Sequence, residues 1–417
     1  MKDSGIEWVG RVPQSWSINP IRAEFQEVTE KNKLGLVKNA LKFTYGNIVK
    51  KDNFDADDDN YVADTILNYT VVNPGTIMLN GLNLNFDFVS QRVALVKERG
   101  IITSAYIAFA PNSNGRISSQ FITYLLKAYD GCKAFHNMGG GVRKILNFSE
   151  LKKQYIVYPT LVEQQRIADF LDAKCAEIDA LTADIQAQID TLEQYKRSVI
   201  TETVTKGLNP NAEMKDSGIE WVEQMPMSWN TVPNKYLMYK VKNICPVYNG
   251  EDILSLTTNG VIIRDLNGGG KMPTSFDGYQ KVTPGNLLMC LFDIDVTPRC
   301  IGLVKNFGLT SPAYSQFVMR TGAYAPYYYY YYLMVDYTKE LLHMAKNLRH
   351  SLTEDQLGAI KAPNPPYEEQ VQIAEFLDKK CVEISRVIED KNKQLATLDD
   401  YKKSLIFEYV TGKKEVV

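Results

Sequence analysis

The stretch Met214–Trp229, MKDSGIEWVEQMPMSW, repeats the stretch Met1–Trp16, MKDSGIEWVGRVPQSW. The two copies are identical over their first nine residues, and Trp16 of the first copy recurs as Trp229 of the second. All four tryptophans of the chain lie in these copies. Such a repeat indicates a tandem duplication, and the large aromatic side chains indicate that each copy packs against something that both halves share.

A long helical pattern follows each half of the chain. In the first half it runs without Gly or Pro from Glu163 until Gly207, and in the second half it begins at Glu368. About 44 residues at 1.5 Å each give a helix of roughly 65 Å, longer than a domain needs for its own core. We therefore expect each helix to pair with a partner helix, and the two similar helices are natural mates in an antiparallel arrangement.

Hydrophobic residues repeat along both helical patterns at the spacing of a coiled-coil seam. In the first pattern they are Leu171, Ile178, Ile185, Leu192 and Val199, with Ile167, Cys175, Leu181, Ile189 and Tyr195 on the alternate positions. In the second they are Leu377, Ile384, Leu398 and Leu405, and Lys391 interrupts the series. We interpret the seven-residue repeats as the helix seam and as a docking surface for partners.

The segments between the tryptophan copies and the helices predict mixed globular domains. Short β-rich runs at Thr70–Leu79, Phe88–Lys97 and Gly100–Phe109 are broken by Gly, Pro and Asn, and a helical pattern lies near Ser119–Ala128. The second half echoes these runs in the same order, as Val282–Gly285 echoes Val72–Gly75. Both halves should therefore have one fold.

The predicted fold is α/β (α+β): two tandem globular domains, separated by long antiparallel coiled-coil helices, in a pseudo-twofold, cyclic arrangement with close termini. The expected boundaries are a first globular domain with its Trp segment at 1–158, a central long helix at 159–208, a second globular domain at 209–362 and a C-terminal long helix at 363–417. The globules have diverged more than the helices. The chain is thus built to present two different surfaces at a fixed separation.

Bulk composition excludes several classes of function. The formal charge of −2 and the pI near 6.1 give no global attraction to polyanions, so a nucleic-acid surface must be local or completed by a partner. Six cysteines form no CxxC pair and three histidines lack ligand spacing, which predicts reduced thiols and no metal site. The chain starts with a repeat unit rather than a leader and has no long apolar run, so we expect a soluble cytoplasmic protein.

Two motifs suggest catalysis, but their context argues against it. Asn364–Tyr367 spells the NPPY of amino-methyltransferases, yet no glycine-rich cofactor loop precedes it and the twin position Val157–Thr160 lacks the motif. A rigid entry to the second helix is the better interpretation. Gly268–Lys271 resembles a phosphate loop but lacks the further Gly and the Ser or Thr that such a loop needs. A flexible loop that touches a DNA backbone is the better interpretation there.

Two other segments are of interest for nucleic-acid binding. Gly139–Lys144 places a flexible backbone beside Arg143, and its counterpart in the second half keeps an arginine, Arg349, in register. The six tyrosines Tyr327–Tyr332 align with Ser119–Tyr124, a helical pattern, so about half of them should face the core rather than stack on bases.

The chain resembles a known family at this level of detail. Two variable globules, each followed by a helix that starts with Glu-Gln-x-x-Ile-Ala-x-Phe-Leu-Asp and runs to Tyr-Lys-x-Ser-x-Ile, resemble the specificity (S) subunits of type I restriction–modification systems. The most specific segments are Glu163–Ala168 with Glu369–Ala374, together with the Trp copies. The second helix departs slightly, with Val371 and Gln372 where the first has Gln165 and Arg166.

This resemblance implies a non-catalytic subunit that gives a restriction and DNA methylation complex its sequence specificity. Each globule would be a target recognition domain that reads one half of a bipartite, asymmetric site in double-stranded DNA. The helices would set the spacer and dock two methyltransferase (M) subunits, and restriction/translocase (R) subunits would join them. S-adenosylmethionine, ATP and Mg are expected on those partners, with no cofactor and no membrane contact on this chain.

We expect DNA contacts from polar and basic loop residues that differ between the halves, because Arg bridges guanine, Asn bridges adenine and Lys more often meets phosphate. The candidates are Lys50, Lys51, Asn80, Asn83, Asn85, Arg92, Arg143, Lys144, Arg264, Lys271, Arg299, Arg349 and His350. Two alternatives stay open: a coiled-coil adaptor that does not bind DNA, and an N6-adenine methyltransferase that uses Asn364-Pro365-Pro366-Tyr367.

Overall fold

The computed structural model describes residues 1–51, 66–89, 91–266, 273–345 and 349–416. The chain divides into two compact units. Unit 1 comprises Met1–Ile185 and Lys393–Val417, and unit 2 comprises Gln186–Asn392. Each unit therefore combines one globular part with a portion of both long helices.

Unit 1 is built on a four-stranded antiparallel sheet in the order β4-β11-β8-β9. Four two-stranded pairs surround it: β1 with β2, β10 with β7, β12 with β3 and β5 with β6. Its strands are β1 (Lys2–Asp3), β2 (Arg11–Val12), β3 (Ser17–Pro20), β4 (Phe25–Glu27), β5 (Leu41–Thr44), β6 (Asn47–Lys50), β7 (Thr70–Val72), β8 (Ile77–Leu79), β9 (Val93–Leu95), β10 (Gly100–Ile102), β11 (Ile107–Pro111) and β12 (Tyr155–Tyr158). Its short helices are α1 (Ile21–Glu24), α3 (Ser119–Gly131), η1 (Ala134–Asn137) and α4 (Phe148–Leu151).

Unit 2 repeats this plan element by element. Its four-stranded sheet has the order β16-β23-β20-β21, again with four two-stranded pairs. Its strands are β13 (Met214–Ile219), β14 (Val222–Pro226), β15 (Asn230–Pro233), β16 (Met238–Val241), β17 (Leu254–Thr257), β18 (Gly260–Ile263), β19 (Gln280–Val282), β20 (Leu287–Met289), β21 (Ile301–Leu303), β22 (Gly308–Thr310), β23 (Ser315–Met319) and β24 (Lys361–Asn364). Its short helices are η2 (Asn234–Tyr236), α6 (Ala325–Tyr337), η3 (Glu340–Met344) and α7 (Glu354–Ala359). The prediction of one fold in two tandem copies is confirmed.

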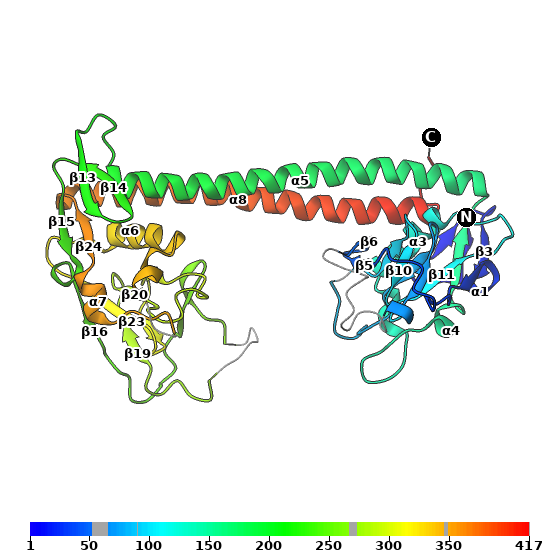
Figure 1. The fold of residues 1–417 in the computed structure, drawn as a ribbon, viewed down its shortest axis with the longest axis horizontal. Coiled ribbons are helices and arrows are strands. Elements are labelled where there is room, and N and C mark those ends of the chain that lie inside the picture. The colour runs from blue at the N-terminus through cyan, green and yellow to red at the C-terminus, as the bar shows by residue number, and fades with distance from the viewer. Residues whose placement is uncertain (52–65, 90, 267–272, 346–348, 417) are drawn as a thin grey trace. The chain divides into compact units, whose positions relative to one another are not determined.

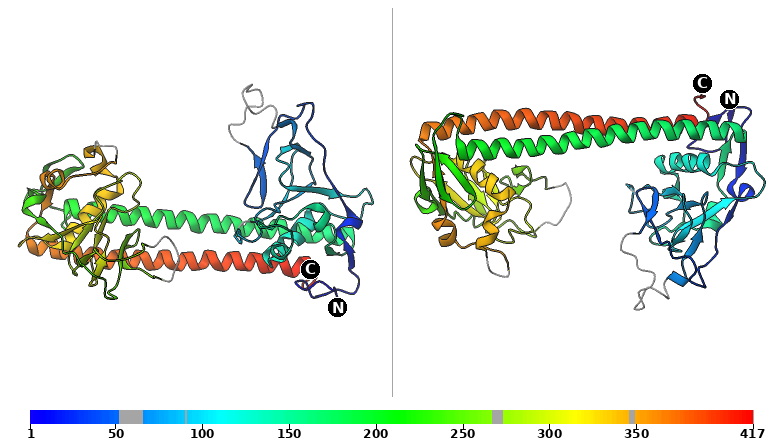
Figure 2. Two further views of the ribbon diagram at one scale, coloured as in Figure 1. Left: turned by 90° about the horizontal axis from the view of Figure 1, so that it is seen from below. Right: turned by 45° about the horizontal axis from the view of Figure 1, so that its top comes forward.

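The two long helices are also confirmed, as α5 (Leu161–Lys206) and α8 (Tyr367–Val410). In each unit a part of α5 lies beside a part of α8 and runs in the opposite direction (Figures 1 and 2). Equivalent lysines link the helices: Lys402 Nζ donates to Asp179 Oδ1 at 2.5 Å in unit 1, and Lys196 Nζ donates to Ser385 Oγ at 2.8 Å in unit 2. The paired helices are therefore linked at equivalent positions in both units, by an ion pair in unit 1 and by a hydrogen bond to a hydroxyl in unit 2.

The predicted seam lies between the helices. Every residue of the two seven-residue series is buried or half-buried: Leu171, Ile178, Ile185, Leu192, Val199, Leu377, Ile384, Leu398 and Leu405. Lys391, which interrupts the series, donates to Gln188 across the pair. The alternate series was partly wrong, because Leu181 and Tyr195 are exposed. The helices bury these side chains against each other, so the seam is not exposed as a docking surface.

The repeated Trp segments seat the C-terminal ends of the long helices. In unit 1 the Trp16 ring lies against Gly412, and in unit 2 the Trp229 ring lies against Gly207. Both glycines have positive φ, 67° and 75°, which ends the helix at the point where the indole needs room. Lys413 Nζ also donates to Val9 O at 3.0 Å. The chain's first and last described segments thus meet in unit 1, which confirms the predicted cyclic arrangement.

Helices α3 and α6 form the base of each globule and tie it to a long helix. Tyr124 OH donates to Asp172 Oδ1 at 2.5 Å, and at the equivalent place Tyr330 OH donates to Asp378 Oδ1 at 2.6 Å. This register places Tyr327–Tyr332 opposite residues 121–126 and corrects the expected alignment. All of the six tyrosines except Tyr329 are buried, so more than half of them belong to the core.

A buried glutamine holds the elbow before each long helix. Gln370 accepts from Tyr324 N at 2.8 Å and donates to Pro365 O at 2.9 Å, while Gln164 accepts from Ser118 N at 2.9 Å and donates to Pro159 O at 3.0 Å. Asn364 of the NPPY segment accepts from Tyr328 OH at 2.9 Å. This geometry supports the interpretation of a rigid helix entry. No helix of the described residues is long and apolar enough to cross a membrane.

Candidate functional site

Each unit presents two loops that lie against each other at one end of its sheet. In unit 1, residues 80–92, of which residue 90 lies outside the described residues, connect β8 to β9, and residues 138–147 connect η1 to α4. In unit 2 the equivalent loops are 290–300 and 345–353, of which 346–348 lie outside the described residues. We call each set a loop pair.

Matching backbone hydrogen bonds join the two loops of each pair. Leu84 N donates to Lys144 O at 3.2 Å in unit 1, and Ile294 N donates to His350 O at 3.3 Å in unit 2. The residues Lys144 and His350 both adopt left-handed backbone conformations, with φ of 39° and 41°. A left-handed conformation is unfavourable for residues with a Cβ and persists where the surroundings impose it. The loop pairs are therefore built in the same way.

An aspartate and a lysine form hydrogen bonds with the backbone of the first loop of each pair. In unit 1, Arg92 N donates to Asp130 Oδ2 at 2.8 Å, and Lys133 Nζ donates to Phe88 O. In unit 2, Cys300 N donates to Asp336 Oδ2 at 2.8 Å, and Lys339 Nζ donates to Thr297 O at 2.7 Å. Each acid is the penultimate residue of α3 or α6, and each lysine follows three residues later with positive φ. We call these residues the Asp–Lys frame.

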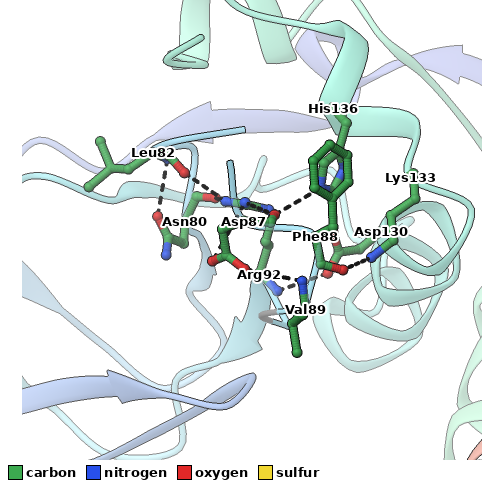
Figure 3. A network of polar contacts seen from close by, with 9 residues as sticks. All are labelled: Asn80, Leu82, Asp87, Phe88, Val89, Arg92, Asp130, Lys133 and His136. Carbon is green, nitrogen blue, oxygen red and sulfur yellow. Dashed lines mark hydrogen bonds and ion pairs between the residues drawn. The ribbon is translucent and has the colours of Figure 1, made fainter. Parts of the chain in front are cut away.

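Arg92 fills the inside of loop 80–92 (Figure 3). Its side chain is fully buried, and its guanidinium donates to Asn80 O at 3.1 Å, to Leu82 O at 2.8 Å and to Asp87 O at 2.6 Å. The carbonyl of Asp87 also lies 3.0 Å from His136 Nε2, and the ring of Phe88 stacks on that histidine at 4.8 Å. Arg92 was expected to contact DNA, and this was wrong because its side chain is fully buried and its two terminal nitrogens donate to carbonyls within the loop.

Cys300 takes the place of Arg92 in unit 2. Its thiol lies 3.5 Å from Lys339 Nζ, and burial raises its pKa to about 12, so the thiol stays protonated at neutral pH. Across the loop root, Cys290 Sγ donates to Phe292 O at 3.3 Å. Loop 290–300 is also two residues shorter than loop 80–92. The frame is thus common to both units, while the loops it carries differ in length and in filling.

The structure brings most of the predicted contact residues together in the loop pairs. Asn83 and Arg143 are exposed in the unit 1 pair, where Asn80, Asn85 and Lys144 are half-buried. In the unit 2 pair Arg349 is exposed, and Arg299 and His350 are half-buried. Asn85 Nδ2 donates to Val142 O at 2.9 Å, and His350 Nε2 lies 3.8 Å from Asp295 Oδ2.

The remaining candidates lie elsewhere. Lys50 ends strand β6, where it pairs with Glu98 at 3.7 Å, and Lys51 follows it on the surface. Arg264 follows β18 and is half-buried. Lys271 lies outside the described residues, as does the rest of Gly268–Lys271. These residues are not part of a loop pair.

The loop tips also expose apolar side chains that sequence reasoning missed. Phe86, Val89 and Val142 are 69%, 91% and 90% exposed in unit 1, and Val296 is 72% exposed in unit 2. These side chains lie in the same loops as the polar candidates. The described residues contain no cluster of His, Cys, Asp and Glu that could hold a metal ion.

The Asp–Lys frame was also missed, although the sequence carries a signal for it. Asp130 and Lys133 keep their register with Asp336 and Lys339 at the spacing that relates the two helices, inside halves that otherwise diverge. Most residues around these positions differ between the two halves. A pair of charged residues that is the same in both halves therefore has a role common to both units.

Comparisons with known proteins agree on one family. Residues 91–191 match the model of the type I restriction modification DNA specificity domain. The chain is 24% identical to the type I restriction enzyme MjaVIII specificity subunit of Methanocaldococcus jannaschii, with 97% of this chain and 94% of that protein covered. It is 22% identical to the putative MjaX specificity subunit of the same organism, with 98% and 96% covered.

Two solved structures share the fold. A chain from work on complex assembly and conformational transition of the type I R-M system superposes with a TM-score of 0.71 at 13% identity, covering 97% of this chain and 100% of that one. The HsdS subunit of Thermoanaerobacter tengcongensis superposes with a TM-score of 0.50 at 14% identity, covering 99% and 100%.

Proposed function

This chain belongs to the family of type I restriction–modification specificity subunits, and on that premise we propose that each unit reads one half of a bipartite, asymmetric site in double-stranded DNA. The loop pairs supply the reading surface. The chain itself performs no chemistry in this proposal. S-adenosylmethionine, ATP and Mg are held by the partner subunits.

The observation that carries the proposal is the repetition of one frame beneath two different loop pairs. Loops that carry function vary on a constant scaffold. Here the scaffold is constant down to single hydrogen bonds, as the bonds from Arg92 N and Cys300 N to their aspartates show. Two different surfaces on one frame suit an asymmetric site with two unlike halves.

The exposed groups of the loop pairs have the chemistry that base and phosphate recognition requires. An amide such as that of Asn83 can bridge the N6 and N7 positions of adenine, and an arginine can bridge guanine or meet phosphate. Apolar tips such as Phe86 suit contact with thymine methyl groups or base steps. Because the net charge of the chain is −2, the partner subunits supply part of the positive surface around the DNA.

The outer faces of the long helices suit two copies of one partner. In unit 1, Leu181 and Tyr401 are exposed beside the ion pair of Lys174 with Glu177, at 2.8 Å. In unit 2, Val387 and Tyr195 are exposed beside the ion pair of Lys380 with Glu383, also at 2.8 Å. We call these the twin helix patches and propose that each docks one methyltransferase subunit.

Each of helices α5 and α8 has one part in unit 1 and one part in unit 2. In this proposal the length of these helices sets the length of the spacer in the DNA site. Half-site spacing follows the distance between recognition elements on a scaffold. Restriction subunits then join this specificity and methyltransferase core. In this assembly the chain contributes positioning and sequence choice.

Methylome sequencing of cells that express the chain with its methyltransferase partner tests the proposal. We expect N6-methyladenine at one bipartite motif, and replacement of the unit 1 loop pair by that of a relative should change one half of the motif only. Failure to retain any duplex with methyltransferase subunits present would favour a coiled-coil adaptor. Binding of S-adenosylmethionine by the purified chain alone would favour an enzyme that uses Asn364–Tyr367.

A further inference from the structure

We propose that the Asp–Lys frame sets the discrimination of each half-site, with Asp130 and Lys133 acting for unit 1 and Asp336 and Lys339 acting for unit 2. These are positioning residues, because they act through the loops rather than on the bases. The proposal rests on the proposed function and adds the residues that fix the geometry of reading.

The frame controls the first loop of each pair at two points. The aspartate fixes the root of the loop through the backbone N–H of its last residue, Arg92 or Cys300. The lysine fixes the side of the loop through a carbonyl, that of Phe88 or Thr297. Two fixed points on a short loop leave its tip little freedom, and hydrogen bonds to bases need that precision.

The two aspartates of the frame are buried beside charged groups. Asp130 and Asp336 are only 7% and 8% exposed. Burial raises the pKa of Asp130, while the backbone N–H and the charge of Arg92 act in the opposite direction. In unit 2 the salt bridge of Lys339 to Asp336, at 2.7 Å, outweighs burial and raises the pKa of Lys339. Removing either acid leaves a backbone N–H without its partner, and removing Asp336 also breaks its ion pair with Lys339.

The loop root of unit 1 also holds a concentration of unpaired polar atoms. Arg92 Nε, Asp130 Oδ1, His136 Nδ1 and Asn85 Oδ1 are buried without a hydrogen-bond partner among the described residues. A region shaped for stability alone pairs such atoms, and local violations gather at functional sites. They belong to the loop and to the residues that contact it, which points to a loop whose shape is selected for reading.

The test uses the chain assembled with its methyltransferase subunits, and measures binding to three duplexes: the cognate site and two sites with base changes in one half only. A loop-pair replacement first shows which half each unit reads. We expect Asp130→Ala to reduce discrimination against changes in the half read by unit 1 by tenfold or more, and to leave the other half unchanged. Asp336→Ala should do the reverse.

Conservative and control variants separate positioning from charge. Asp130→Asn keeps an oxygen that can accept from Arg92 N, so it should retain most of the discrimination. Lys133→Ala should relax the same half-site as Asp130→Ala, whereas Lys153→Ala, an exposed lysine of the same unit, should not. If Asp130→Ala does not assemble, Lys133→Ala provides the same measurement.

Equal weakening on all three duplexes would overturn the inference, because it would show a role in affinity or phosphate contact. Relaxation of both halves by a single variant would overturn it as well. A wild-type complex without half-site discrimination would instead refute the proposed function. The two failures are therefore distinguishable.

Discussion

At the level of single residues, comparison of the two units separates side chains that maintain the fold from side chains that can vary. Gln164 and Gln370 make the same bonds at the same elbow, so the fold requires them. Arg92 and Cys300 occupy one place with opposite chemistry. The side chain at this position can therefore vary with the loop, whereas its backbone N–H makes the same hydrogen bond to the aspartate in both units.

Arg143 and Arg349 are the exposed arginines in register at the loop pairs, and we assign them to the DNA backbone. Replacing either with Ala should weaken binding to all sequences alike and reduce the slope of log K against log salt by about 0.9. The measurement is a salt titration of duplex binding by the assembled complex. Loss of affinity for only one base pair would contradict the assignment.

Glu24 gives unit 1 a pH dependence that we can predict. It is buried, and although burial raises its pKa, hydrogen bonds from Tyr158, Asn114 and Asn19 lower it below the ordinary value of 4.5. The unfolded chain therefore binds a proton before the folded chain does. This contribution to the free energy of unfolding is present above about pH 4.5 and is lost as the pH falls through the lower, folded value.

Glu24→Gln should accordingly lower the free energy of unfolding of unit 1 by about 1–3 kcal/mol at pH 7. The difference from wild type should shrink as the pH falls below 4.5. Urea unfolding at several pH values measures it. A difference that stays constant with pH would show that the carboxylate charge of Glu24 is not the cause. Unit 2 has no such carboxylate, because Leu237 stands at the matching position.

Sequence reasoning reached the candidate site in part. Arg143 and Arg349 were found because a cation beside a flexible backbone recurs in register. Arg92 was misplaced because an arginine in a polar loop looks the same in sequence whether it points outward or inward. Only the carbonyls of Asn80, Leu82 and Asp87, which face it in space, decide between the two.

At the level of elements, turn chemistry explains where the expected strands end. The run Thr70–Leu79 is two strands rather than one, because Pro74 and Gly75, with φ of 88°, turn the chain between β7 and β8. The run Phe88–Lys97 gives only β9, since its first residues belong to loop 80–92. The helices were predicted well because their periodicity is a local signal in the sequence. Strand pairing depends on residues far apart in the sequence, so it was not predicted.

The contact of Trp16 with Gly412 offers a sharp test of how α8 ends. A Cβ at Gly412 would lie 3.1 Å from Trp16 Cζ2 and closer still to Pro13, on a residue whose φ is 67°. Gly412→Ala should lower the free energy of unfolding of unit 1 by about 2–4 kcal/mol, from left-handed strain and crowding together. Urea unfolding followed by tryptophan fluorescence measures this.

Gly5→Ala is the matched control. Its φ is 68°, but an added methyl group would meet no described atom within 4 Å. It should lower the free energy of unfolding by about 1 kcal/mol, from backbone strain alone. Equal effects of the two substitutions would show that crowding against Pro13 and Trp16 contributes nothing.

At the level of the whole molecule, the duplication predicts the stoichiometry of assembly. Tyr401→Ala and Tyr195→Ala each alter one twin helix patch, so each should yield complexes with one methyltransferase subunit in place of two, as measured by native mass spectrometry. The double variant should bind neither. Tyr155→Ala, which removes an exposed tyrosine elsewhere in unit 1, should keep both. Loss of both subunits from either single variant would contradict independent docking.

The order in which the chain is made differs from the order in which its units can close. Unit 2 is continuous, whereas the core of unit 1 includes Leu405, Ile406 and Val410 beside Val9 and Trp16. On the ribosome, the later half can finish folding while the earlier half still lacks its last helix. The nascent N-terminal sheet must wait, with apolar surface uncovered, until translation has passed through all of unit 2. A frameshift after Asn392 would consequently damage unit 1, which is encoded first, and spare unit 2.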